Sequence, residues 1–119
     1  MSYIKTILYI SIFILSNNLY AKPPIFTSSI NDAKQMSEDL QLPILQVVSA
    51  DWCLYCGMLD KTISDNLEVF NDIIILKIDF DTNKDYVEKN NIKKIPTILY
   101  KNDRYIGIYD IKDLKKIIK

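Results

Sequence analysis

Cys53 and Cys56 are the only cysteines of the chain, and they lie in the segment SADWCLYCGML at residues 49–59. Two cysteines separated by two residues can form a redox couple, half of a metal site or a structural disulfide. The chain has no histidine, the commonest nitrogen ligand for metals, and no further cysteine to complete a zinc site. We therefore expect no bound metal, which leaves a redox pair or a structural staple.

The residues before the cysteines predict where the sulfur atoms lie. Residues 44–50, ILQVVSA, are a short apolar run rich in β-branched residues, typical of a buried strand, and helical spacing begins near Cys53. A sulfur at the start of a helix lies close to unpaired backbone N–H groups, which favour the thiolate and lower the cysteine pKa. We therefore expect Cys53 to be the nucleophile of thiol–disulfide exchange and Cys56 to be the resolving thiol.

The residues beside the cysteines predict what the pair reacts with. Trp52 and Tyr55 make the surrounding surface apolar and suit it to docking a protein chain, so we expect protein thiols and disulfides as substrates. Leu54 and Tyr55 separate the two cysteines, and the dipeptide at this place tunes the redox poise of such pairs.

The first 21 residues have the layout of an export signal. Lys5 precedes the apolar run TILYISIFIL, which is short for a membrane span, and Ala21 is a small residue suited to cleavage. We expect a cleaved signal peptide over residues 1–21 and one domain over residues 22–119. An uncleaved membrane anchor or a buried N-terminal strand are the alternatives. Export places the domain in the periplasm or otherwise outside the cytoplasm, where disulfides persist.

The size of the loop between the cysteines bears on the structural alternative. A small exported domain that is stapled for stability usually carries several disulfides at wide spacing. A single bridge across two residues constrains the unfolded chain little, because loop-closure entropy grows with loop length. A redox pair is therefore favoured over a staple.

The overall composition is that of one globular domain. Hydrophobic residues make up 49% of the 119 residues, and 15 basic side chains balance 15 acidic ones. No basic stripe stands out, so nucleic-acid binding has no electrostatic support. We expect a monomer.

The pattern of apolar residues predicts the order helix, strand, helix, strand, helix, strand, strand, helix. A first helix begins near Ser29 and ends before Pro43, and residues 22–28 form a loop or a short edge strand. The other elements are expected at residues 44–50, 53–66, 72–80 and 83–91, in two strands around a turn at Asn102-Asp103, and at residues 111–119. A βαβ unit followed by a hairpin and a helix predicts an α/β fold with a central mixed sheet covered by helices on both faces.

A proline at the start of a predicted strand is a further signal. Ile95-Pro96-Thr97 begins such a strand about forty residues after the cysteines. Proline there serves a turn or a cis bond, or is a trans proline at the first residue of a strand.

With ADWCLYC at residues 50–56, KIDFDTN at 77–83 and NNIKKIPTILYKND at 90–103, the chain resembles the thioredoxin superfamily from Ser29 to Lys119. The resemblance implies a thioredoxin-like fold whose cis-proline loop, with Ile95 and Pro96, lies against the cysteines and binds substrate backbone. ADWC in an exported chain is similar to the periplasmic C-terminal domain of the transmembrane electron-transfer protein of the Dsb system, and to small periplasmic thioredoxin-like reductases.

Two positions depart from the thioredoxin pattern. Many thioredoxins carry a buried acid six residues before the first cysteine, which helps to move the proton of the resolving cysteine, and here that position is Val47. Lys77 falls where thioredoxins often have a buried lysine near that acid. The resemblance therefore implies that Lys77 or water handles the proton of Cys56, or that the resolving step is slow.

The sequence also bears on the direction of electron flow, that is, on whether the pair reduces or oxidises its clients. Ile95 before the proline is the thioredoxin-like choice, and no histidine lies between the cysteines to stabilise the thiolate further. These features favour a reductase or electron relay over a disulfide oxidase or isomerase, with no cofactor beyond a Cys53–Cys56 disulfide. A reductase in an oxidising compartment needs an electron donor, which implies a membrane electron-transfer partner. A non-catalytic binding module, either a chaperone or a metal carrier, is the alternative from another class.

Overall fold

Five strands of the computed structural model form one mixed sheet, in the order β1-β3-β2-β4-β5. The structure describes residues 20–119, so the signal peptide predicted over residues 1–21 lies, except for its last two residues, outside the described residues. The strands are β1 (Ile25–Thr27), β2 (Ile44–Ser49), β3 (Ile74–Asp79), β4 (Thr97–Tyr100) and β5 (Asp103–Ile106). β3 pairs in parallel with β1 and β2, whereas β4 pairs antiparallel with β2 and β5.

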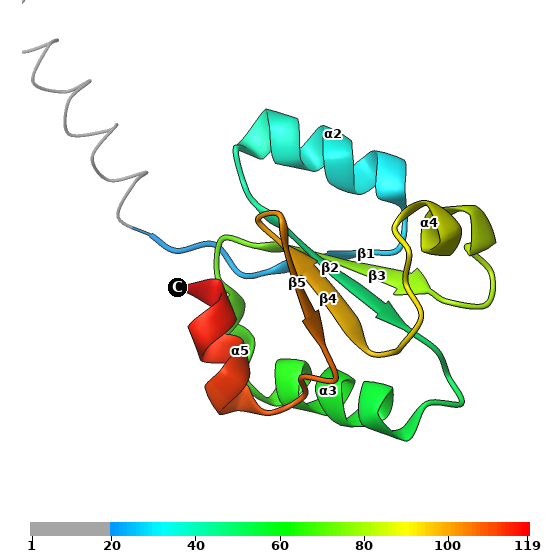
Figure 1. Cartoon of the computed structure of the whole chain (residues 1–119). Helices are drawn as coiled ribbons and strands as arrows, with labels where there is room; N and C mark the ends of the chain where they lie inside the picture. Colours follow the sequence, from blue (N-terminus) through cyan, green and yellow to red (C-terminus); the bar gives the residue numbers. More distant parts are fainter. Residues whose placement is uncertain (1–19) are drawn as a thin grey trace, which may run out of the picture.

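Helices cover both faces of the sheet (Figure 1). The helices α2 (Ile30–Leu40) and α4 (Lys84–Lys89) lie on one face, and α3 (Leu54–Asp65) and α5 (Ile111–Ile118) lie on the other. A short 3₁₀ helix, η1 (Leu67–Phe70), follows α3 and was not predicted from the sequence. The predicted α/β fold, a central mixed sheet flanked by helices, is confirmed. Within residues 20–119, no helix is both long and apolar enough to cross a membrane.

Two hydrophobic clusters hold these layers together. Residues alternate between the two faces of a strand, so the three inner strands β2, β3 and β4 supply residues to both clusters. The cluster beneath α3 and α5 contains Leu45, Val47, Leu59, Ile63, Phe70, Ile73, Ile75, Ile98, Tyr100, Leu114 and Ile117. The cluster beneath α2 and α4 contains Ala33, Val48, Ile74, Leu76, Ile78 and Ile92. The central strand β2 therefore packs against helices on both sides, and its carboxyl end leads to Cys53.

Local sequence signals account for several element boundaries. Ser29 is the N-cap of α2, where a helix was expected to begin, and its side chain accepts a hydrogen bond from the Asp32 N–H at 3.2 Å. The hairpin turn lies one residue earlier than predicted. Lys101 and Asn102 occupy it with φ angles of 48° and 68°, while Asp103 already pairs with Tyr100 in the ladder. Two successive positive φ angles suit the right-handed twist of a tight hairpin, and this outweighs the low intrinsic preference of lysine for that conformation.

Candidate active site

The two cysteines lie where the central strand β2 gives way to helix α3, and they are joined by a disulfide. Cys53 is the N-cap of α3, with extended backbone angles of −92° and 115°, and its Cα lies 5.2 Å from that of Cys56. Its Sγ accepts a hydrogen bond from the Cys56 backbone N–H at 3.3 Å. In the reduced protein, this donor and the other free N–H groups of the first turn stabilise a thiolate at Cys53.

The two sulfur atoms differ in exposure. Cys53 is half-buried and reachable from solvent, whereas Cys56 is only 1% exposed. An external disulfide can therefore reach Cys53, while Cys56 can react only with a sulfur already attached to Cys53. This asymmetry is what the predicted roles of nucleophile and resolving thiol require.

The loop before β4 lies against the cysteines, although it is remote from them in sequence. The backbone carbonyl oxygen of Ile95 lies 3.9 Å from the Sγ of Cys53. The Ile95–Pro96 peptide bond is cis, and the Pro96 ring is fully buried. The Pro96 carbonyl accepts a hydrogen bond from the Gly107 N–H at 2.9 Å, and Gly107 has a left-handed φ of 71° that favours glycine. The structure thus brings Ile95 and Pro96 together with the redox pair.

An apolar surface surrounds the half-buried Cys53. Trp52, Leu54, Tyr55 and Met58 are all exposed, and Leu54 is the most exposed of them at 75%. Large exposed apolar side chains that gather at one place mark an interaction site. Trp52, Leu54 and Tyr55 were predicted from the sequence as site residues, whereas Met58, which lies one helical turn beyond Leu54, was not.

Two contacts that the sequence did not predict hold the aromatic rings of this surface. The indole N–H of Trp52 donates a hydrogen bond to Asp81 at 2.8 Å, across 29 residues of sequence. Tyr55 stacks on Tyr109 from the loop before α5, with ring centroids 5.3 Å apart. No local pattern marks Asp81 or Tyr109, because each contacts the site only through the fold.

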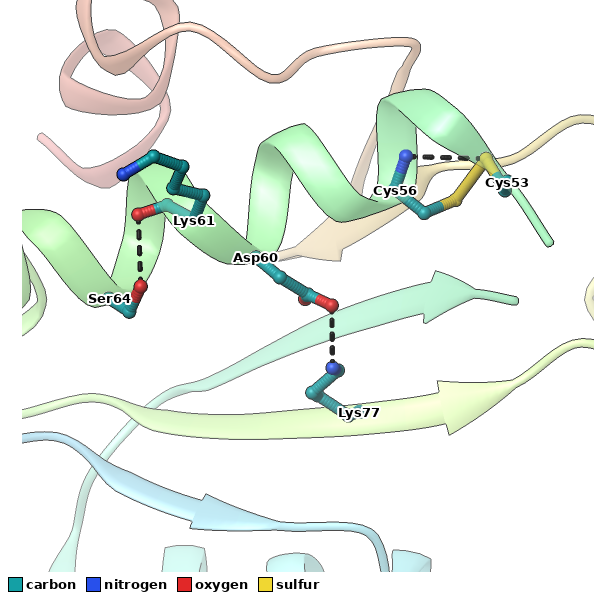
Figure 2. A network of polar contacts seen from close by, with 6 residues as sticks. All are labelled: Cys53, Cys56, Asp60, Lys61, Ser64 and Lys77. Atoms are coloured by element: carbon teal, nitrogen blue, oxygen red, sulfur yellow. Dashed lines mark hydrogen bonds and ion pairs between the residues drawn. A yellow bond between two sulfur atoms is a disulfide. The ribbon is translucent and has the colours of Figure 1, made fainter. Parts of the chain in front are cut away.

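Lys77 is partly exposed, unlike the buried lysine that thioredoxins often have at this position. Its side chain is 45% exposed, and its Nζ pairs with the Asp60 carboxylate of α3 at 2.9 Å (Figure 2). Val47 lies directly beside Lys77 in the parallel register and is fully buried. Because valine and not an acid occupies position 47, no carboxylate there offsets the cost of burying the Lys77 ammonium group. The ammonium group pairs instead with the Asp60 carboxylate on α3. Among residues 20–119, no group of three or more metal-binding side chains is gathered.

Comparison with known proteins identifies the family. A family model described as Thioredoxin matches residues 26–119. The chain belongs to the thioredoxin family. A thioredoxin from Rickettsia bellii (strain RML369-C) is 30% identical over 95 residues, which cover 73% of this chain and 90% of that protein.

Solved structures show the same fold. Thioredoxin O1 from Arabidopsis thaliana in the oxidised state superposes with a TM-score of 0.65 at 22% identity, over 82% of this chain and 96% of that one. A mutant thioredoxin from Halobacterium salinarum NRC-1 gives a TM-score of 0.65 at 24% identity, over 83% of this chain and 92% of that one. As a member of the thioredoxin family with its CxxC pair at disulfide distance, the chain is a thiol–disulfide oxidoreductase, and such proteins act on protein thiols and disulfides. The predicted superfamily is thereby confirmed, whereas the likeness to the Dsb-system domain stays a prediction.

Proposed function

We propose that this protein is an exported reductase or electron relay, which passes electrons from a membrane electron-transfer protein to the disulfides of other exported proteins. The observation that carries the redox chemistry is the pairing of a half-buried, N-capping Cys53 with a buried Cys56. The apolar run before Ala21 supports export to the periplasm or another compartment outside the cytoplasm. The thioredoxin-like Ile95-Pro96 pair and the absence of histidine support the reducing direction.

The chemistry proceeds in two exchanges. The Cys53 thiolate attacks one sulfur of the client disulfide, so that a mixed disulfide forms and one client thiolate leaves. The Cys56 thiolate then attacks the Cys53 sulfur, the Cys53–Cys56 disulfide forms and the second client thiolate leaves. The client gains two electrons and the protein loses them, and the membrane donor restores the dithiol by the reverse sequence. The cysteine pair is the only redox group that this scheme requires.

The surface around Cys53 supports a protein client rather than a small molecule. Trp52, Leu54 and Tyr55 present apolar area to the solvent, and the carbonyl of Ile95 beside the Cys53 sulfur is a backbone acceptor for an extended chain. Clients of this kind bind by apolar contact with main-chain hydrogen bonds, which tolerates varied sequences.

Insulin reduction tests the dithiol chemistry. The domain over residues 22–119 is expected to reduce insulin with dithiothreitol as donor, while Cys53→Ser and Cys56→Ser abolish turnover. No turnover in the wild type would instead favour the non-catalytic chaperone or metal carrier, and turnover that survives both substitutions would refute the assignment of the chemistry to Cys53 and Cys56.

Equilibration with glutathione tests the direction. We expect a reduction potential near that of thioredoxin, about −270 mV, rather than that of the strong periplasmic oxidant, about −120 mV. A value at the oxidising end would reassign the protein to disulfide formation or isomerisation.

Trapping with Cys56→Ser in the native host tests the partners, because its Cys53 should accumulate mixed disulfides with clients and with the membrane donor. The same extracts test export, since the mature chain is expected to begin at Lys22, and size-exclusion chromatography tests the expected monomer.

A further inference from the structure

The resolving step demands a proton acceptor for Cys56. Its thiol must lose a proton before it can attack the Cys53 sulfur. The thiol is 1% exposed, so bulk water reaches it poorly, and burial in apolar surroundings disfavours the charged thiolate. The chain holds no histidine that could take the proton.

Asp60 is the carboxylate that the helix itself places nearest to this thiol. It follows Cys56 by four residues on α3, and side chains at that spacing are neighbours on one helix face, with Cβ atoms about 5–6 Å apart. Both side chains leave α3 on the side that faces the sheet (Figure 2). Asp60 is half-buried there rather than fully solvated.

Lys77 holds the Asp60 carboxylate toward the sheet. Its Nζ lies 2.9 Å from Asp60 Oδ2, and it comes from β3, directly beside Val47 in the register. The other ion pair of α3 differs in its setting. Asp65 pairs with Lys61 at 2.8 Å within the helix, and both of those side chains are more exposed than Asp60 and Lys77.

A groove gives water access to this pair. It has a volume of about 350 Å³ and is lined by Val47, Asp60 and Lys77, among others, between α3 and the sheet. Lys77 also lines a second, more polar groove at the carboxyl ends of β2 and β3, beside Ala50 and Asp51. Both are large enough for several water molecules, at about 30 Å³ each, and polar groups at their walls can hold such water in place.

We propose that Asp60, positioned by Lys77, accepts the proton of Cys56 through a water molecule between the two side chains when Cys56 attacks the mixed disulfide. The proton moves from the Cys56 thiol to the carboxylate, the sulfur electron pair forms the bond to Cys53, and the client thiolate leaves with the electrons of the broken bond. In the reverse reaction, Asp60 returns the proton to the departing Cys56 sulfur. This assignment rests on the proposed dithiol chemistry and specifies which side chain serves its second step.

A chromogenic aromatic disulfide separates the two steps. When the reduced protein meets an excess of 5,5′-dithiobis(2-nitrobenzoate), attack by Cys53 releases one coloured thiolate and resolution by Cys56 releases a second. Stopped-flow absorbance gives a rate for each phase. Asp60→Asn is compared with Asp65→Asn, a matched control that removes the other carboxylate of the two α3 ion pairs, and Asp60→Glu restores the carboxylate one methylene further out.

We expect Asp60→Asn to slow the second phase by about a hundredfold, the low end of what a positioned acid–base group contributes, with the first phase within twofold of wild type. Asp65→Asn should leave both phases unchanged, and Asp60→Glu should recover at least half of the lost second-phase rate. Lys77→Gln should slow the second phase alone, because Asp60 loses its anchor.

Three results would overturn the assignment of Asp60. The second phase of Asp60→Asn could match that of Asp65→Asn, both phases could slow together, or Asp60→Glu could stay as slow as Asp60→Asn. A normal second phase in Lys77→Gln would remove the positioning role of Lys77. If the wild type released no coloured thiolate by a route that depends on Cys53, the dithiol chemistry itself would fail, so the two failures are distinct.

Discussion

Leu54 and Leu59 allow the same substitution to be made on opposite sides of the active-site helix. Both residues belong to α3, but Leu59 is fully buried in the cluster beneath α3 and α5, whereas Leu54 is 75% exposed beside the cysteines. The substitution to alanine removes the same atoms at each position. We expect Leu59→Ala to destabilise the fold without altering the client surface, and Leu54→Ala to weaken client reduction without altering stability.

The size of each effect follows from how deeply the leucine side chain is buried. Leu59→Ala removes buried carbon atoms and leaves a cavity, which costs about 3 kcal/mol within a usual range of about 2–5 kcal/mol. For a domain of this size, that lowers the melting temperature by roughly 12–24 °C. Leu54→Ala should change stability by less than about 0.5 kcal/mol. If docking buries about half of the removed apolar group, its loss costs about 1 kcal/mol, or about fivefold in kcat/KM.

The loss of stability in Leu59→Ala is measured by urea unfolding of the oxidised protein, followed by circular dichroism. The loss of client reduction by Leu54→Ala is measured by comparing the rate of insulin reduction with that of a small aromatic disulfide, because a protein substrate covers much more of the surface around Leu54 than a small disulfide does. The assignment of Leu54 to the client surface is refuted if Leu54→Ala destabilises the fold as much as Leu59→Ala does. It is also refuted if Leu54→Ala slows the reduction of both substrates equally, since the defect would then lie in the cysteines and not in the surface that docks the client.

Three other contacts give direct predictions. Asp81→Ala removes the acceptor of the indole of Trp52, the only tryptophan, so acrylamide should quench its fluorescence more strongly while stability changes by less than about 1 kcal/mol; unchanged quenching would contradict this. Ser29→Ala removes the N-cap of α2 and should cost about 1 kcal/mol in urea unfolding, with insulin reduction unaffected. Burial raises the pKa of the Tyr86 phenol above its ordinary value of 10.0, although Arg104 opposes this. The unfolded chain therefore releases this proton first, and the stability of the wild type relative to Tyr86→Phe should fall as the pH rises above about 10; a constant difference would refute it.

Much of the fold could be predicted because its signals are local. The helix that begins after Ser29, the buried strand before the cysteines and the start of α3 at Cys53 each depend on residues within a few positions of one another. Apolar periodicity and N-cap chemistry act over that range. The redox pair could be predicted for the same reason, since both sulfur atoms lie within one helical turn.

The remaining features depend on which segments the sheet order places side by side. The contact of Trp52 with Asp81 and that of Lys77 with Asp60 join residues 29 and 17 positions apart, and neither pair carries a local pattern. Lys77 falls where thioredoxins often have a buried lysine, but here its side chain is 45% exposed, because Val47 beside it on the neighbouring strand carries no charge to offset its burial. The amino-acid pattern thus specified the elements and the reactive sulfur atoms. The residues that surround those sulfur atoms were decided by tertiary packing. Contacts between distant segments form only when the whole fold offsets the conformational entropy that is lost in bringing the segments together.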